Sequence, residues 1–245
     1  MIGGQGKFDE DLKLLVARLS ADMPQDARAK LDKLKKDLSE MHRVNVVKIN
    51  HSVMELVCAK YLIMKGFEVE LEYPLDAVLT CDVYSTKGYG NLIVEIETGY
   101  IPPEHAMDPL TYTAARLASK IVRYSSFAGK FAIGVPPHYV LPLPASLSLP
   151  PRRRTQQDIE RLKALCDRFY QQPPVTEDCI RNARIQEIYV IDVDRLRVEE
   201  MDPEAYMRRA LNKGVVFSAE DETLLEEQVH PKQTRQEEKI DFYMK

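Results

Sequence analysis

Residues 91–99, NLIVEIETG, constrain the fold of this chain more than any other segment. Their run of aliphatic side chains is typical of a buried central strand. The same strand carries Glu95 and Glu97, which share one face with Ile93 because side chains alternate along a strand. Burying two ionised carboxylates without compensation costs several kcal/mol each. We therefore expect a positive partner beside them, and a divalent cation suits oxygen ligands placed in this way.

The flanking segments predict an α/β fold in which helices cover a mixed sheet. Strands are predicted at residues 67–73, 77–84, 92–98, 130–135 and 185–193. Helices are predicted at residues 8–43 with a break at Pro24, and at 50–65, 108–127, 155–170 and 203–213. In the first strand Phe67, Val69, Leu71 and Tyr73 alternate with three glutamates, which predicts one buried and one solvated face.

The chain divides into three predicted regions. They are an N-terminal helical hairpin at residues 1–46, an α/β core at 47–214 and a charged C-terminal tail at 215–245. In the hairpin Leu31, Leu34 and Leu38 repeat at intervals of three and four, which forms an apolar seam. We expect this seam to pack against the same chain, and a contact between two copies is the alternative.

Composition limits the class of protein. No run approaches about 18 consecutive apolar residues, and the first residues lack the basic-then-apolar pattern of a signal peptide. The four cysteines are scattered without a CxxC motif, which favours a reducing environment and unpaired thiols. We therefore expect a cytoplasmic protein without a membrane segment.

Charge is distributed unevenly along the chain, although the net charge is only -4. Residues 51–109 contain three Lys or Arg and ten Asp or Glu, whereas residues 110–170 contain ten Lys or Arg and three Asp or Glu. An acidic block followed by a basic one is typical of a metal site beside a phosphate-binding surface. Two faces that attract each other within the fold would give the same pattern.

Two further acids are placed where they can join Glu95. Asp82 lies among apolar residues in the preceding strand, and the hairpin would set it opposite Glu95. Glu55 falls on the apolar stripe of the preceding helix, where an acid is out of place unless it faces a site. The alternatives are a strand-end role for Asp82 and a position at the edge of the buried face for Glu55. His51 lies beside Asn50, the predicted helix cap, which explains it without a ligand role.

This order of elements resembles that of the PD-(D/E)XK nucleases, which include restriction endonucleases and archaeal Holliday junction resolvases. The pattern is a helix with Glu55, two strands of which the second carries Asp82, a strand with Glu95-Ile96-Glu97, and then a helix and a strand. It spans residues 50–135, about a third of the chain. The resemblance implies a restriction-endonuclease-like mixed sheet flanked by helices.

One position departs from the motif of that family. Glu97 stands where the family has its lysine, which removes the cation that usually orients the attacking water. Some restriction enzymes of this fold carry Glu there and remain active. In the family the lysine sometimes comes from a neighbouring element, and Lys120 and Arg123 on the next helix are the candidates. Contacts with phosphate or solvent are the alternative for both.

The resemblance implies a metal-dependent nuclease that acts on DNA. Asp82 and Glu95, with the backbone carbonyl of Ile96, would hold Mg²⁺ or Mn²⁺, which would polarise a phosphodiester and lower the pKa of a water molecule. Glu97 would be a further ligand or the general base for that water. Glu55 would hold a second metal ion or its hydration shell. Paired cuts in a duplex usually need two active sites, so a homodimer is expected.

The basic residues that follow the motif are expected to contact the DNA backbone. They are Arg116, Lys120, Arg123, Lys130, Arg152, Arg153 and Arg154. The first three share one helical face and would form a cationic stripe along the phosphates. A solvated loop is the alternative for the run of three arginines.

Two other functions fit the same sequence. A catalytically inactive protein of the same fold would bind nucleic acid or a protein partner, and the glutamate at the lysine position favours it. A structural assembly protein, which belongs to a different class, would work through the helical hairpin and the charged tail.

Overall fold

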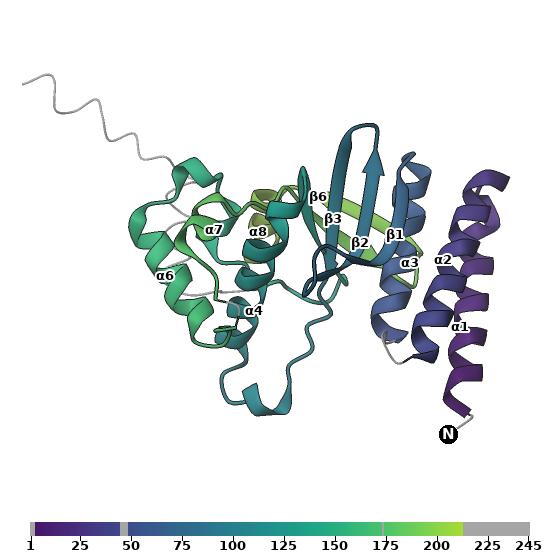
Figure 1. Cartoon of the computed structure of the whole chain (residues 1–245), viewed down its shortest axis with the longest axis horizontal. Helices are drawn as coiled ribbons and strands as arrows, with labels where there is room; N and C mark the ends of the chain where they lie inside the picture. The colour runs from purple at the N-terminus through teal and green to yellow at the C-terminus, as the bar shows by residue number, and fades with distance from the viewer. Residues whose placement is uncertain (1–2, 45–48, 173, 213–245) are drawn as a thin grey trace, which may run out of the picture.

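A computed structural model describes residues 3–44, 49–172 and 174–212 of the chain (Figure 1). Within these residues, eight α-helices flank a six-stranded mixed sheet that does not close into a barrel. The predicted α/β class is confirmed. The predicted charged tail at residues 215–245 lies outside the described residues.

The strands follow one another across the sheet in chain order. They are β1 (Glu68–Pro74), β2 (Thr80–Lys87), β3 (Gly90–Ile96), β4 (Lys130–Val135), β5 (Glu187–Asp192) and β6 (Arg197–Met201). β1, β2 and β3 form an antiparallel meander, β4 and β5 continue parallel to β3, and β6 is antiparallel to β5. The edge strand β6 is not predicted from the sequence, because its residues show no apolar alternation. In the structure none of its residues is buried.

The helices are α1 (Gly3–Leu19), α2 (Gln25–Arg43), α3 (Ile49–Met64), α4 (Pro109–Tyr124), α5 (Ala145–Ser148), α6 (Gln156–Asp167), α7 (Glu177–Asn182) and α8 (Pro203–Asn212). α2, α3, α4, α6 and α8 begin close to the predicted positions, whereas α1 begins at Gly3 instead of residue 8. The short helices α5 and α7 are not predicted from the sequence. Thr155 and Asp158 form a capping box at the start of α6. Asn50 is not the cap of α3, because that helix already begins at Ile49. In the described ranges no helix combines the length and the apolar character that a membrane span requires.

Helices cover both faces of the sheet (Figure 1). α1, α2 and α3 stack beside one face, and their buried side chains form one cluster with Leu71, Val94 and Ile96 of the sheet. α4, α6, α7 and α8 contribute to the cluster on the other face. The seam of α2 is buried within the chain, so the predicted packing of the hairpin is confirmed. The division of the chain at residue 46 stays a prediction.

β1 and β2 both change face at one point, between the Leu71–Val83 pair and the Tyr73–Cys81 pair of the register. Leu71 packs on the α3 side of the sheet, whereas Tyr73 packs on the α4 side and stacks on Tyr84. The predicted alternation is therefore wrong at Tyr73. The change of face coincides with a φ of 50° at Glu72, a backbone conformation that residues other than glycine rarely adopt.

Gly99, two residues after Glu97, lies close to the ring of Tyr139. Gly99 and Gly88 both have positive φ, 81° and 60°. A Cβ atom at Gly99 would lie 2.6 Å from the ring of Tyr139, whereas a Cβ at Gly88 would meet nothing within 4 Å.

We expect Gly88→Ala to lower the free energy of unfolding by about 1 kcal/mol because of its backbone conformation alone. Gly99→Ala should lower it by at least about 1 kcal/mol more, because the methyl group also clashes with the ring. Urea denaturation measures both variants. Equal losses would show that the ring of Tyr139 does not pack on Gly99 as described.

Candidate functional site

The candidate site lies where β2 and β3 stop pairing. The ladder between these strands ends at Val83 and Val94. Beyond this point Asp82 supplies the contacts: its Oδ2 accepts a hydrogen bond from the Ile96 N–H at 2.5 Å, and its own N–H donates to Oε1 of Glu95 at 3.1 Å. The expected proximity of Asp82 and Glu95 is therefore observed.

The side chains of β3 alternate between the two faces, as predicted. Ile93 belongs to the α4-side core, whereas Val94 and Ile96 belong to the α3-side core. Glu95 and Glu97 are only 1% and 2% exposed. Both carboxylates are thus buried, and they require a positive partner.

Lys120 of α4 is that partner. Its Nζ lies 2.8 Å from Oε1 of Glu97, 3.0 Å from Oε2 of Glu95 and 3.8 Å from Oδ2 of Asp82. It also donates to the carbonyl of Ile96 at 3.2 Å. Burial alone would lower the pKa of Lys120, but the three carboxylates outweigh burial and hold this pKa well above its usual value. Lys120 is therefore a charged group enclosed by four oxygen-bearing neighbours.

Arg116 lies one helical turn before Lys120 and adds a second cation. Its Nη2 lies 3.4 Å from Oε2 of Glu97, and its Nη1 donates to the carbonyl of Tyr100 at 3.2 Å. Glu97 is thus held by one cation at each of its two oxygens.

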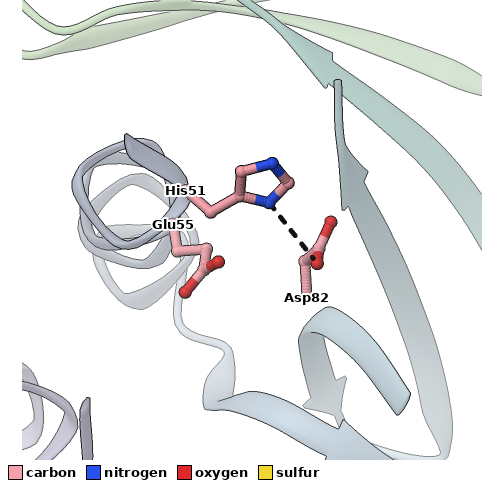
Figure 2. Close-up of side chains that lie close together, drawn as sticks. All are labelled: His51, Glu55 and Asp82. Atoms are coloured by element: carbon pink, nitrogen blue, oxygen red, sulfur yellow. Dashed lines mark ion pairs between the residues drawn. The ribbon is translucent and has the colours of Figure 1, made fainter. Parts of the chain in front are cut away.

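A second group of side chains approaches Asp82 from α3. Figure 2 shows His51 and Glu55 on this helix, with both side chains directed toward Asp82 on the facing strand. Nδ1 of His51 lies 3.9 Å from Oδ1 of Asp82, and one ligand atom from each of the three residues lies within 4.8 Å of the others. Asp82 therefore directs one oxygen toward α3 and the other toward Ile96 and Lys120.

Glu55 is fully buried, and neither of its carboxylate oxygens has a hydrogen-bond partner among the described residues. Burial, followed by the negative charge of Asp82, raises the pKa of Glu55 well above its usual value. The position at the edge of the buried face is thereby excluded. A buried carboxylate without a partner is costly, and a ligand that supplies positive charge would remove this cost.

Asp82 and Glu95, which meet where the β2–β3 ladder ends, have pKa values that are shifted in opposite directions. Burial alone would raise the pKa of Asp82, but Lys120, His51 and the Ile96 amide together hold it below its usual value. Burial and the charge of Asp82 raise the pKa of Glu95, although Lys120 opposes the shift. Asp82 is therefore the acid that stays ionised, and Glu95 is the acid more able to exchange a proton.

His51 and Glu72 belong to this region but are not predicted as site residues from the sequence. His51 lies one helical turn before Glu55, and this spacing is a signal that would have placed it on the same face of the helix. Glu72 is predicted on a solvated face, but the change of face in β1 places it within the electrostatic influence of Asp82. Burial, followed by the charge of Asp82, raises the pKa of Glu72 to about 7. No sequence signal indicates a positive φ at a glutamate.

The predicted cationic stripe does not form an open surface. Arg116 and Lys120 are directed at the carboxylates of the site. The guanidinium of Arg123 lies over the ring of Tyr170, 5.8 Å from its centre. Two of the three cations of the stripe, Arg116 and Lys120, therefore compensate buried carboxylates.

Two of the other predicted basic residues, Lys130 and Arg154, make contacts with other parts of the chain. Lys130 is beside the start of β3 and pairs with Glu187 at 2.7 Å. Arg154 is buried, and its guanidinium donates to backbone carbonyls of the segments around α5 and α7. The expected phosphate contact of Arg154 is therefore wrong, because its guanidinium is buried and its hydrogen bonds are made to these carbonyls. Arg152 and Arg153 are exposed.

Comparison of the chain with protein-family models, with curated proteins and with solved structures gives no match. Its function must therefore be inferred from the residues of the site.

The raised pKa of Glu72 predicts a pH dependence of stability. The folded state binds the Glu72 proton more tightly than the unfolded state, whose glutamates titrate near 4.5. The stabilising effect of this proton is present at low pH and is lost as pH rises toward 7. The metal-free protein should therefore lose melting temperature between pH 5 and 8, and Glu72→Gln should lose less.

Thermal melting in EDTA across this pH range checks the prediction. Glu70→Gln is the matched control, because Glu70 lies on the same strand and is exposed. It should keep the pH dependence of the wild type. A Glu72→Gln variant with the wild-type dependence would mean that Glu72 does not retain its proton in the folded state.

Proposed function

We propose that this chain is a metal-dependent nuclease with a restriction-endonuclease-like fold that hydrolyses phosphodiester bonds of DNA. The observation that carries the proposal is the convergence of Asp82, Glu95 and Lys120 where the β2–β3 ladder ends, beside the unpartnered carboxylate of Glu55. The element order α3, β1, β2, β3, α4, β4 is also the order that the resemblance to PD-(D/E)XK nucleases implies.

The α3 side of the site fits a divalent cation. Two ligands of one ion at about 2.2 Å lie at most about 4.4 Å apart. The ligand atoms of His51, Glu55 and Asp82 are within 4.8 Å of one another, so small movements of the side chains suffice. Two carboxylates suit Mg²⁺ and Mn²⁺ alike.

Each residue has a role that follows from its position. When bound, the cation would supply Lewis-acid polarisation of the phosphodiester and a lowered pKa of water. Glu55 and Asp82 would hold it, together with His51. Lys120 would stabilise negative charge that develops on the phosphate. Glu95, whose pKa is raised, would accept the proton of the attacking water.

Glu97 takes a different role from the one expected of a ligand or general base. Its two oxygens face Lys120 and Arg116. Glu97 would therefore position Lys120, and the lysine on α4 would take over the function of the lysine that the motif lacks.

A protein that binds without cleaving is the second candidate. Lys120 and Arg116 already compensate Glu95 and Glu97 within the chain, so these carboxylates do not require a metal ion for stability. Such a protein would bind nucleic acid or a protein partner through the same surface.

Cleavage of labelled single-stranded, duplex and branched DNA in Mn²⁺ or Mg²⁺ separates the two candidates. We expect EDTA to abolish cleavage, and Asp82→Asn and Glu55→Gln to lower the rate by about 100-fold or more, because each removes a ligand. Glu70→Gln should cleave like the wild type. Failure of the folded wild-type protein to cleave any of these DNAs would contradict the nuclease proposal and favour the second candidate.

A further inference from the structure

Lys120 lies at the position where the sequence predicts a metal ion. The expected ligands were the carboxylates of Asp82, Glu95 and Glu97 and the carbonyl of Ile96. Nζ of Lys120 is the shared neighbour of all four, and three of these oxygens lie 2.8 to 3.2 Å from it. These are distances of direct contact, so no ion can enter among the same oxygens unless the ammonium group leaves.

We propose that the site holds a single divalent cation on its α3 side, between His51, Glu55 and Asp82, and that the ammonium group of Lys120 takes the place of a second ion on its α4 side. The inference rests on the proposed metal dependence. It concerns the number and position of the ions, which are measured without reference to cleavage.

The two sides of the site differ in what they lack. On the α4 side, Glu95 and Glu97 each have a cation in contact. On the α3 side, Glu55 is 0% exposed and neither of its oxygens has a hydrogen-bond partner among the described residues. A positive charge beside Glu55 is therefore what would allow this buried carboxyl group to ionise, as a metal ligand must.

Asp82 joins the two sides. Its Oδ1 is directed at His51, 3.9 Å away, whereas its Oδ2 accepts from the Ile96 amide and lies 3.8 Å from Lys120. In sites with two metal ions about 3.5–4 Å apart, the ions together clamp the reacting phosphate. Here one carboxylate would bridge one metal ion and one ammonium group, so that the same clamp needs only a single metal.

Counting bound Mn²⁺ by equilibrium dialysis and electron paramagnetic resonance tests the inference. The wild type should bind one ion, and Glu55→Gln should weaken its binding by at least about 10-fold. Lys120→Met should bind two ions, because it exposes the oxygens of Asp82, Glu95 and Glu97. Lys120→Arg keeps the charge and should bind one.

A second variant covers the case in which Lys120→Met does not fold. The pair Lys120→Gln with Glu97→Gln removes one positive and one negative charge together, and it leaves the ligand atoms of Asp82, Glu95 and Ile96 for the second ion. It should also bind two ions. Circular dichroism establishes that each variant is folded before ions are counted.

The outcomes separate this inference from the proposed function. A wild type that binds two ions or none, or a folded lysine variant that still binds one, overturns the inference. Unchanged Mn²⁺ affinity in Glu55→Gln also overturns it. Cleavage with two ions bound would retain the nuclease and reject the single-ion site, whereas one bound ion without cleavage would do the reverse.

Discussion

The site depends on the hydrogen bonds of Asp82, which take the place of the backbone ladder between β2 and β3 beyond Val83 and Val94. The Asp82 carboxylate accepts a hydrogen bond from the Ile96 N–H, and the Asp82 N–H donates to the Glu95 carboxylate, so the two strands are held together where their own pairing has ended. Lys120 of α4 approaches Asp82 on one side of this point, and His51 and Glu55 of α3 approach it on the other. Without Lys120, the buried carboxylates would cost several kcal/mol each, so the folded state depends on the cation to which the proposed chemistry assigns a role.

The parts of this arrangement that follow from local rules could be predicted from the sequence. Alternation along β3 placed Glu95 and Glu97 on one face, and the hairpin placed Asp82 opposite Glu95. The parts that failed depend on tertiary structure. A positive φ at Glu72 coincides with the change of face in β1. Arg154 is buried and donates to backbone carbonyls. A run of arginines and a strand with alternating glutamates carry no signal of either event.

The role of Lys120 could be predicted only in part from the sequence. Its helical position made it a candidate for a displaced lysine, but helical spacing also suggested a phosphate-binding stripe. The distances from Nζ to three carboxylates decide between these readings, because a lysine enclosed in this way compensates acids first. Only the packing of α4 against the end of β3 provides that information. The unpartnered carboxylate of Glu55 then marks the side on which positive charge is still missing.

Anomalous diffraction from crystals of the wild-type protein soaked in Mn²⁺ tests the central claim most directly. The account predicts one anomalous peak, bounded by His51, Glu55 and Asp82, with Lys120 still in contact with Glu95 and Glu97. A peak among Asp82, Glu95 and the Ile96 carbonyl, with the Lys120 side chain moved away, would contradict it. The absence of any peak in this region would contradict it equally.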